Sequence, residues 1–296
     1  LVRVIFMHIP VLLQESIDQL NLEHASIVVD GTFGGGGHTK KMLDLFPHLK
    51  VIAVDLDEDA QKRFDALLGS EPRAQFIHAN YKDAAKILEA AKVDAVDGVL
   101  IDMGTSTFQL LADTRGFSFN SDTPLTMTFS KEGSHTGFNA YDIVNTWQAD
   151  SIADIIYFYG EDVKARVIAK AIVDAREDGE IITAKQLAEV IESVVKRKGK
   201  IHPATKTFQA LRIAVNDEYK AIEDALEAWY ERLTPGGRIA VITFHSGEDR
   251  VVKQWMRTHE RVITKKPIAP TKTELLANPR SRSAKLRVIQ KVNTEI

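Results

Sequence analysis

Four consecutive glycines, Gly34 to Gly37, stand in the stretch VVDGTFGGGGHTKK (28–41), between an apolar run and the expected start of a helix. Glycine loses more backbone freedom on folding than any other residue, so such a cluster at a strand–helix junction indicates that something approaches the backbone closely. A phosphate, a dinucleotide or another nucleoside cofactor would need this approach. A tight turn that serves only packing is the alternative.

The residues around the glycines distinguish these ligands. A Walker A phosphate loop places Lys and Ser or Thr directly after its last glycine, whereas Gly37 is followed by His38 and Thr39. A dinucleotide fingerprint fits better, because Asp55 ends the next apolar run, 24 residues after Gly31. This is about the spacing of an acid that binds a ribose hydroxyl.

Two further acids help to distinguish a dinucleotide from other nucleoside cofactors. Asp30 directly precedes the loop, and Asp102 ends a later apolar run. Three carboxylates would repel a pyrophosphate, whereas they favour the cationic sulfonium and ammonium groups of S-adenosylmethionine. The charge pattern therefore favours a methyl donor, with helix N-capping as the structural alternative for each aspartate.

The elements that must position these acids alternate along the first third of the chain. Short apolar, β-branched runs at 26–30, 50–57, 74–80 and 96–104 are separated by stretches with helical spacing. This alternation predicts an α/β fold, with a mostly parallel sheet and helices on both faces. Functional residues are then expected at the carboxyl ends of the strands.

The alternation of strand and helix patterns stops after Gly104. Residues 105–140 show no clear periodicity, and helical patterns follow up to about residue 198. A long helix at 207–233 then leads through a Pro-Gly-Gly turn into another strand, so the sheet resumes. We expect a Rossmann-like methyltransferase domain formed by 1–104 and 207–296, interrupted by a mainly helical insertion, 105–206.

Composition excludes several classes of chemistry. The 296 residues include no cysteine, so neither a thiolate nucleophile nor a cysteine-ligated zinc site can form. No apolar run approaches the roughly 20 residues of a membrane span. We expect a cytoplasmic protein without membrane contact. The net charge of −3 means that any nucleic-acid surface must come from local basic patches.

Several longer stretches, in order over nearly the whole chain, resemble the bacterial small-subunit ribosomal RNA cytosine-N4 methyltransferase family. They are HIPVLLQE (8–15), VDGTFGGGGH (29–38), AVDLDEDA (53–60), DGVLIDMGTSTFQL (97–110), RGFSF (115–119), KIHPATKTFQALRIAVNDE (200–218), LTPGGRIAVITFHSGEDRVVK (233–253) and NPRSRSAKLR (278–287).

The resemblance implies a class I S-adenosylmethionine-dependent methyltransferase fold with an inserted substrate-recognition domain. It implies N4-methylation of a cytidine near the decoding centre of 16S ribosomal RNA, no metal, and ribosomal RNA or the immature 30S subunit as partner. A homodimer is left open. The implied cofactor contacts are Gly36, Gly37, His38, Asp55, Tyr81, Asp102 and Gln109.

The chain departs from the family pattern in two places. Thr126, Thr128 and Ser130 replace two acids and an arginine, which puts the detail of substrate binding in doubt. Gly247 stands where the family has leucine.

Methylation at the exocyclic nitrogen of cytosine needs a proton acceptor, because the lone pair of this amine is delocalised into the ring. Asp102, Asp122 and His245 are the candidate catalytic residues, and the sequence does not choose among them. Methylation at carbon 5 ordinarily requires a cysteine adduct, and the chain has no cysteine.

RNA binding is expected from two basic stretches and from aromatic residues that stack on a flipped base, Phe117 or Phe119. The stretches contain Lys196, Arg197, Lys198, Lys200 and Lys206, and Arg280, Arg282, Lys285 and Arg287. Solvated surface and core packing are the simpler interpretations. Two other functions stay open, an NAD-dependent oxidoreductase and a non-catalytic RNA-binding ribosome assembly factor.

Overall fold

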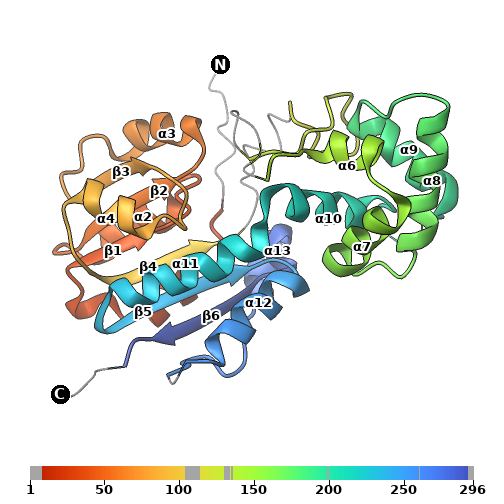
Figure 1. Ribbon diagram of the computed structural model, residues 1–296. Coiled ribbons are helices and arrows are strands. Elements are labelled where there is room, and N and C mark those ends of the chain that lie inside the picture. The colour runs from red at the N-terminus through yellow and green to blue at the C-terminus, as the bar shows by residue number, and fades with distance from the viewer. Residues whose placement is uncertain are drawn as a thin grey trace. The chain divides into compact units, whose positions relative to one another are not determined.

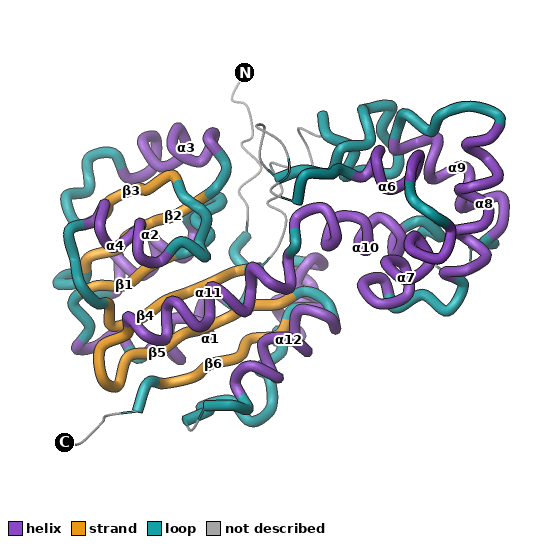
Figure 2. Tube along the Cα trace, in the orientation of Figure 1, coloured by secondary structure: helices purple, strands orange, loops and turns teal. Residues whose placement is uncertain are grey.

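The computed structural model describes residues 9–103, 114–129, 134, 136–197, 199, 201–259 and 261–292. The chain forms two compact units, one from residues 1–106 and 219–296 and one from residues 107–218. Figure 1 shows the order of their elements along the chain, and Figure 2 separates helices, strands and loops.

The first unit contains one six-stranded sheet with the order β3-β2-β1-β4-β5-β6. Neighbouring strands are parallel except β5 and β6, which pair antiparallel. The strand order reverses direction between β1 and β4, which is where doubly wound sheets place their ligands. The strands are β1 (Ile27–Asp30), β2 (Lys50–Asp55), β3 (Ala74–His78), β4 (Val96–Asp102), β5 (Leu233–Thr243) and β6 (Lys285–Gln290).

Helices cover both faces of this sheet. Successive residues of a strand point to opposite faces, so each strand contributes side chains to both of the cores that the helices cover. Val28 packs into the core beneath α1, α2 and α3, and Val29 packs into the core beneath α4, α11 and α12. The helices are α1 (Leu13–Leu20), α2 (Gly37–Leu45) and α3 (Glu58–Leu68) on one face, and α4 (Ala84–Ala91), α11 (Glu218–Arg232) and α12 (Ser246–Met256) on the other. The mostly parallel α/β fold predicted from the sequence is confirmed.

The C-terminal part of the first unit runs along the free edge of β6. Residues Val262 and Ile268 form antiparallel bridges to Ile289 and Leu286. The short helix α13 (Lys272–Ala277) and the 3-10 turn η2 (Pro279–Ser283) then lead into β6, and a second 3-10 turn, η1 (Leu22–His24), precedes β1.

The second unit is helical and has its own core, which contains Leu125, Ile143, Ile168 and Leu211. Its helices are α6 (Ala140–Thr146), α7 (Ala149–Gly160), α8 (Ala165–Glu177), α9 (Ala184–Val194) and α10 (Thr205–Asn216). Within the described residues, no helix is long and apolar enough to cross a membrane.

The prediction of a single helix over 207–233 is wrong. Asp217 adopts a left-handed conformation with φ of 48° and ends α10, so α11 starts as a separate helix. Helix α10 packs closely against α7 in the second unit, where a side chain at Gly160 would come within 2.6 Å of the Lys206 carbonyl oxygen. The contacts therefore divide the chain after residue 218 rather than after 206.

Candidate functional site

Backbone hydrogen bonds fix the glycine-rich loop across the carboxyl ends of three strands. The Gly31 N–H donates to the Leu100 carbonyl oxygen of β4, and the Phe33 N–H donates to the Val54 carbonyl oxygen of β2, both at 2.8 Å. The carboxylate of Asp55 accepts from the Gly34 N–H at 2.7 Å and from the Asp57 N–H at 2.8 Å. Asp55 thus holds the loop in place, and burial raises its pKa.

The glycines of the loop have different structural roles. Gly36 has φ of 76°, and a Cβ atom there would lie 2.6 Å from the Phe33 ring and 2.7 Å from Leu67. A Cβ atom at Gly37 would lie 2.1 Å from Pro10. Gly34, with φ of 52°, has only the Thr32 carbonyl oxygen nearby, at 3.8 Å. Packing therefore requires glycine at 36 and 37, and the open approach to the backbone is at Gly34, which the sequence did not single out.

His38 lies in the first turn of α2 with its side chain turned into the protein. Its Nε2 atom donates to the Val11 carbonyl oxygen at 3.2 Å, and burial lowers its pKa to about 4, so the ring is neutral. The backbone N–H groups of the first turn of a helix have no intrahelical acceptor, and they favour a carboxylate or another anion. The predicted cofactor contact of His38 is therefore one for its backbone rather than its ring.

Asp30, at the end of β1, is fully buried beneath the loop. Its carboxylate accepts from the Thr39 hydroxyl at 2.6 Å and from the Thr32 N–H at 3.4 Å, which ties β1 to α2. Burial raises its pKa to about 6 despite these hydrogen bonds. With a pKa of about 6, Asp30 is mostly ionised at neutral pH. It therefore adds a negative charge at the carboxyl ends of the strands.

Asp102, at the end of β4, carries the clearest signal of a ligand. Its Oδ1 atom is buried and has no hydrogen-bond partner in the described part of the chain. Its backbone N–H donates to the Thr32 hydroxyl at 2.7 Å, which fixes its position. Burial, followed by the charges of Asp30 and Glu248, raises its pKa to about 8. An unsatisfied buried carboxylate costs free energy, and a cationic hydrogen-bond donor such as an ammonium group would satisfy it.

Tyr81 follows β3 and borders the loop, with its Cβ atom 3.3 Å from the position of a Cβ at Gly31. Its carbonyl oxygen accepts from the indole N–H of Trp229 at 2.7 Å. Trp229 is fully buried on α11, and a buried indole N–H usually has a partner. The sequence did not predict this positioning residue, because 148 residues separate the two.

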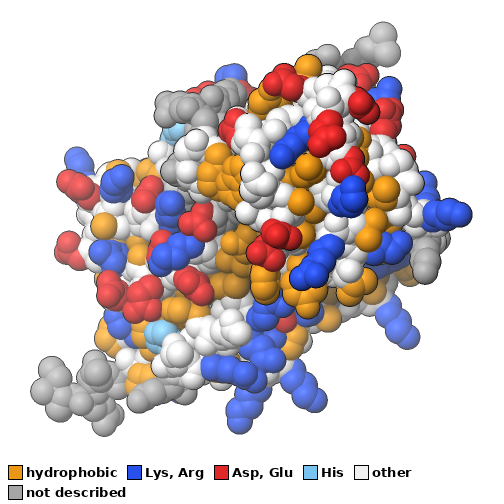
Figure 3. Space-filling view, turned by 45° about the vertical axis from the view of Figure 1, so that its right-hand side comes forward, with side chains coloured by type: hydrophobic (Ala, Val, Ile, Leu, Met, Phe, Trp, Pro, Cys, Tyr) orange, Lys and Arg blue, Asp and Glu red, His pale blue; other side chains and the backbone are white. Residues whose placement is uncertain are grey.

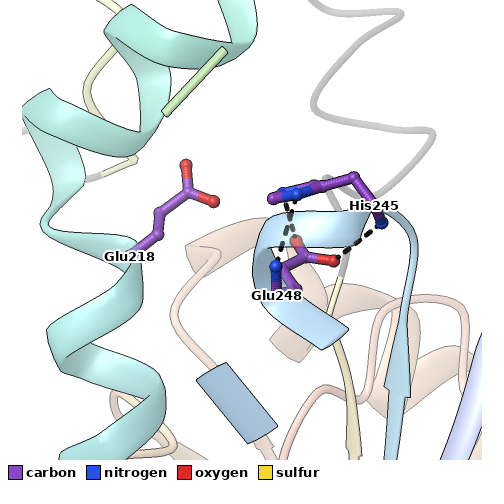
Figure 4. Close-up of side chains that lie close together, drawn as sticks. All are labelled: Glu218, His245 and Glu248. Carbon is purple, nitrogen blue, oxygen red and sulfur yellow. Dashed lines mark hydrogen bonds and ion pairs between the residues drawn. The ribbon is translucent and has the colours of Figure 1, made fainter. Parts of the chain in front are cut away.

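His245 is the N-cap of α12 and forms a capping box with Glu248 (Figure 4). Its Nδ1 atom accepts from the Glu248 N–H at 3.4 Å, and its Nε2 atom lies 3.0 Å from Glu248 Oε1. Glu248 also accepts from the Phe244 N–H at 2.7 Å. The helix cap therefore holds Nδ1, whereas Nε2 is buried near Glu248 and has no hydrogen-bond partner in the described part of the chain, so these contacts do not decide between a structural and a catalytic role for His245. Glu218, also drawn in Figure 4, pairs with Arg212 at 2.7 Å in the second unit.

The remaining predicted site residues are placed as follows. Asp122 belongs to the second unit, where its largely exposed carboxylate lies 3.9 Å from Lys185 Nζ. Gln109 lies outside the described residues. Within the first unit, the structure brings Asp30, Asp55, Asp102 and Tyr81 to one edge around the glycine loop, and their cofactor contacts stay predictions.

The six-stranded sheet with an antiparallel last strand, and acids at the ends of β1, β2 and β4, fits a class I methyltransferase. The profile of the MraW methylase family matches residues 5–292. The chain belongs to this family.

Curated relatives agree over nearly the full length. A ribosomal RNA small subunit methyltransferase H from Cyanothece sp. is 45% identical, covering 97% of this chain and 96% of that protein. Proteins with the same name from Deinococcus deserti and Methylobacterium nodulans are 44% and 42% identical, covering 96% and 98% of this chain and 93% and 91% of their own lengths.

The structure shows what surrounds each of the two departures from the family pattern. A Cβ atom at Gly247 would lie 1.7 Å from the Tyr219 hydroxyl oxygen, so Tyr219 fills the space that a larger side chain would need. In the second unit, Asn216 donates to the Met127 carbonyl oxygen and accepts from the Phe129 N–H, both at 2.8 Å. Hydrogen bonds with the Asn216 side chain therefore hold the backbone of the altered segment around Thr126 and Thr128.

Proposed function

We propose that the protein transfers a methyl group from S-adenosylmethionine to N4 of a cytidine in small-subunit ribosomal RNA, near the decoding centre. The family and the names of its relatives support this proposal. The observation that carries it is Asp102, whose buried carboxylate has an oxygen without a partner in the described part of the chain and stands close to Asp30 and Glu248. A cation beside these carboxyl groups favours their ionised forms, whereas a pyrophosphate disfavours them.

The residues at this edge fit the cofactor. Asp55 would accept from the ribose hydroxyls, since one of its oxygens accepts a single hydrogen bond from Gly34 and the other a single one from Asp57, which leaves each with a further lone pair. Tyr81 would stack on the adenine, and the N–H groups at the start of α2 would bind the carboxylate. Asp102 would bind the ammonium group. When bound, S-adenosylmethionine supplies an electrophilic methyl group.

The protein's own residues must orient the base and accept one proton from its exocyclic nitrogen. Asp102 reaches the ionised state once a cation lies beside it, because opposite charge lowers the pKa of a carboxyl group. His245 stays a second candidate, with its Nε2 atom buried beside Glu248 and without a hydrogen-bond partner in the described part of the chain. Asp122 stays a third candidate, with its exposed carboxylate in the second unit. Alignment of the amine with the methyl group supplies the rest of the acceleration.

The second unit is the proposed substrate-recognition domain. Lys196 and Arg197 are exposed, whereas Lys198 and Lys200 lie outside the described residues. Lys206 donates to the Glu161 carbonyl oxygen at 2.7 Å. Phe119 stacks on His202 with ring centroids 4.1 Å apart, and Phe117 stacks on Phe129 at 5.7 Å. These ring contacts favour a packing role for Phe117 and Phe119. Their stacking on a flipped base stays a prediction. A cytoplasmic location is part of this proposal, because the proposed partner is the small ribosomal subunit.

Cofactor binding separates this proposal from an NAD-dependent oxidoreductase. In isothermal titration calorimetry, S-adenosylmethionine and S-adenosylhomocysteine should bind and NAD should not. The Asp102→Asn variant should bind S-adenosylmethionine at least about tenfold more weakly, because a charge-assisted hydrogen bond of about 1.5–3 kcal/mol is lost. Saturable binding of NAD without binding of S-adenosylmethionine would overturn the proposal.

A further inference from the structure

The surface of residues 246–292 is strongly basic in a chain whose net charge is −3. Among its described residues, no acid is exposed, since Glu248 and Asp249 are buried and Glu274 is half-buried. Figure 3 shows Lys and Arg side chains gathering in the lower part of the view, where acidic side chains are sparse. The exposed cations of this segment are Arg250, Lys253, Arg257, Arg261, Lys265, Lys266, Lys272, Arg280 and Arg282.

Helix α12 separates charges that serve packing from charges that face solvent. On its inner side, Asp249 pairs with Arg287 at 2.7 Å and with Lys285 at 3.0 Å, which docks the helix on β6. Lys285 and Arg287, expected from the sequence to contact RNA, therefore hold the fold together. On the outer side, Lys253 and Arg257 are four residues apart and share one face.

The chain after α12 adds further cations on a fixed backbone. Ile268 and Leu286 exchange backbone hydrogen bonds at 2.9 and 2.8 Å, so the segment that carries Lys265 and Lys266 is fixed along β6. No ion pair within the described residues involves Lys253, Arg257, Lys265, Lys266, Lys272 or Arg282. Clustered charges of one sign repel one another, so the array destabilises the free protein unless an anion neutralises it.

We propose that these six residues form a binding surface for the phosphate backbone of RNA on the methyltransferase unit itself, called here the α12 surface. Helix α12 begins beside His245, and the charge of Glu248 in its first turn acts on Asp102. An RNA strand that follows α12 would therefore place a neighbouring nucleotide at the proposed cofactor edge. This inference rests on the proposed function.

The composition of the α12 surface favours RNA over an acidic protein partner. Protein interfaces have apolar, aromatic centres that are depleted in lysine. Among the described residues of 246–292, Leu276 is the one exposed large apolar side chain. The surface ends toward α11, where Glu227 accepts from the Trp255 indole at 2.9 Å. Phosphate contacts of this kind position RNA without reading its sequence.

A matched pair of variants tests the α12 surface. The test variant carries Lys253→Ala, Arg257→Ala and Lys266→Ala, and the control carries Lys50→Ala, Lys62→Ala and Lys86→Ala, with the same change in net charge. Binding of deproteinised small-subunit ribosomal RNA is measured by fluorescence anisotropy between about 50 and 200 mM salt. Affinity for S-adenosylmethionine, measured by calorimetry, should stay unchanged in both.

The test variant should bind RNA roughly tenfold or more weakly at low salt, and the slope of log K against log salt should be shallower by about two units, since about 0.7 counterions are released per contact with a single strand. The control should match the wild type. Wild-type affinity and slope in the test variant would overturn the inference. So would a loss confined to intact small-subunit particles, because the partner would then be a protein. Wild-type protein that binds this RNA as predicted but methylates neither the RNA nor the particles would overturn the proposed function alone.

Discussion

Asp55 connects the geometry of the loop to the affinity for the cofactor. Its carboxylate holds the Gly34 N–H at 2.7 Å and is positioned to accept from a ribose. Asp55→Ala removes both interactions, so calorimetry should show at least about a tenfold weaker affinity for S-adenosylmethionine. Thr183→Ala is the control, because Thr183 caps α9 in the second unit, where its side chain accepts from the Gln186 N–H. It should lose about 1 kcal/mol of stability with unchanged affinity. If Asp55→Ala binds S-adenosylmethionine with wild-type affinity, Asp55 does not bind the cofactor.

Asp102 makes the stability of the cofactor-free protein depend on pH. Its pKa is raised to about 8, whereas an unfolded aspartate titrates near about 4. The folded state therefore binds more protons across this window, and the free energy of unfolding falls as pH rises from about 4 through about 8. Asp30, with its pKa raised to about 6, contributes to the lower part of the fall.

Asp102→Asn should reduce this fall, because it removes the titrating group while keeping the shape of the side chain. Urea unfolding at pH values from about 5 to 8 measures the effect. The variant should lose less stability over this range than the wild type. An equally steep fall in the variant would show that Asp102 ionises normally in the folded protein.

At the scale of elements, α11 and α12 meet where Gly247 faces the Tyr219 side chain. A Cβ atom at Gly247 would lie 1.7 Å from the Tyr219 hydroxyl oxygen and 2.7 Å from its Cζ atom. Gly247→Leu, the family residue, should therefore lower the free energy of unfolding by about 1–3 kcal/mol through overpacking. Urea unfolding of the single variants and the double variant measures the effect.

Tyr219→Ala should relieve the overpacking, so Gly247→Leu should cost less in the Tyr219→Ala background than in the wild type. The coupling should reach about 0.5–3 kcal/mol, as for residues in direct contact. Purely additive effects would show that the tyrosine does not occupy the space of the missing side chain.

The elements were predictable where the signal is local in sequence. The first four strands and the acids that end them follow from apolar runs and their polar ends, which is why Asp30, Asp55 and Asp102 could be identified. Contacts that join distant segments could not be predicted. They include the burial of His38 against Val11, the hydrogen bond from Trp229 to Tyr81, and the pairing of Arg287 with Asp249. The break at Asp217 was missed because helical spacing continues on both sides of it.

At the scale of the whole molecule, a net charge near zero hides a separation of charges. Carboxylates gather at one edge of the sheet, where burial raises their pKa values, and exposed cations gather on the α12 surface. A cationic cofactor and an anionic RNA each match one of these regions. The first unit therefore offers complementary surfaces for both substrates of a methyl transfer.

The most direct test of the central claim is the identity of the methylated product. Small ribosomal subunits from a bacterial strain lacking its own enzyme are incubated with the protein and isotopically labelled S-adenosylmethionine. The RNA is then digested to nucleosides, which are separated and identified by mass spectrometry. We predict one labelled nucleoside, N4-methylcytidine, with labelling lost in Asp102→Asn. A label on carbon 5 of cytosine or on another base, or no label from a protein that binds S-adenosylmethionine, would contradict the account.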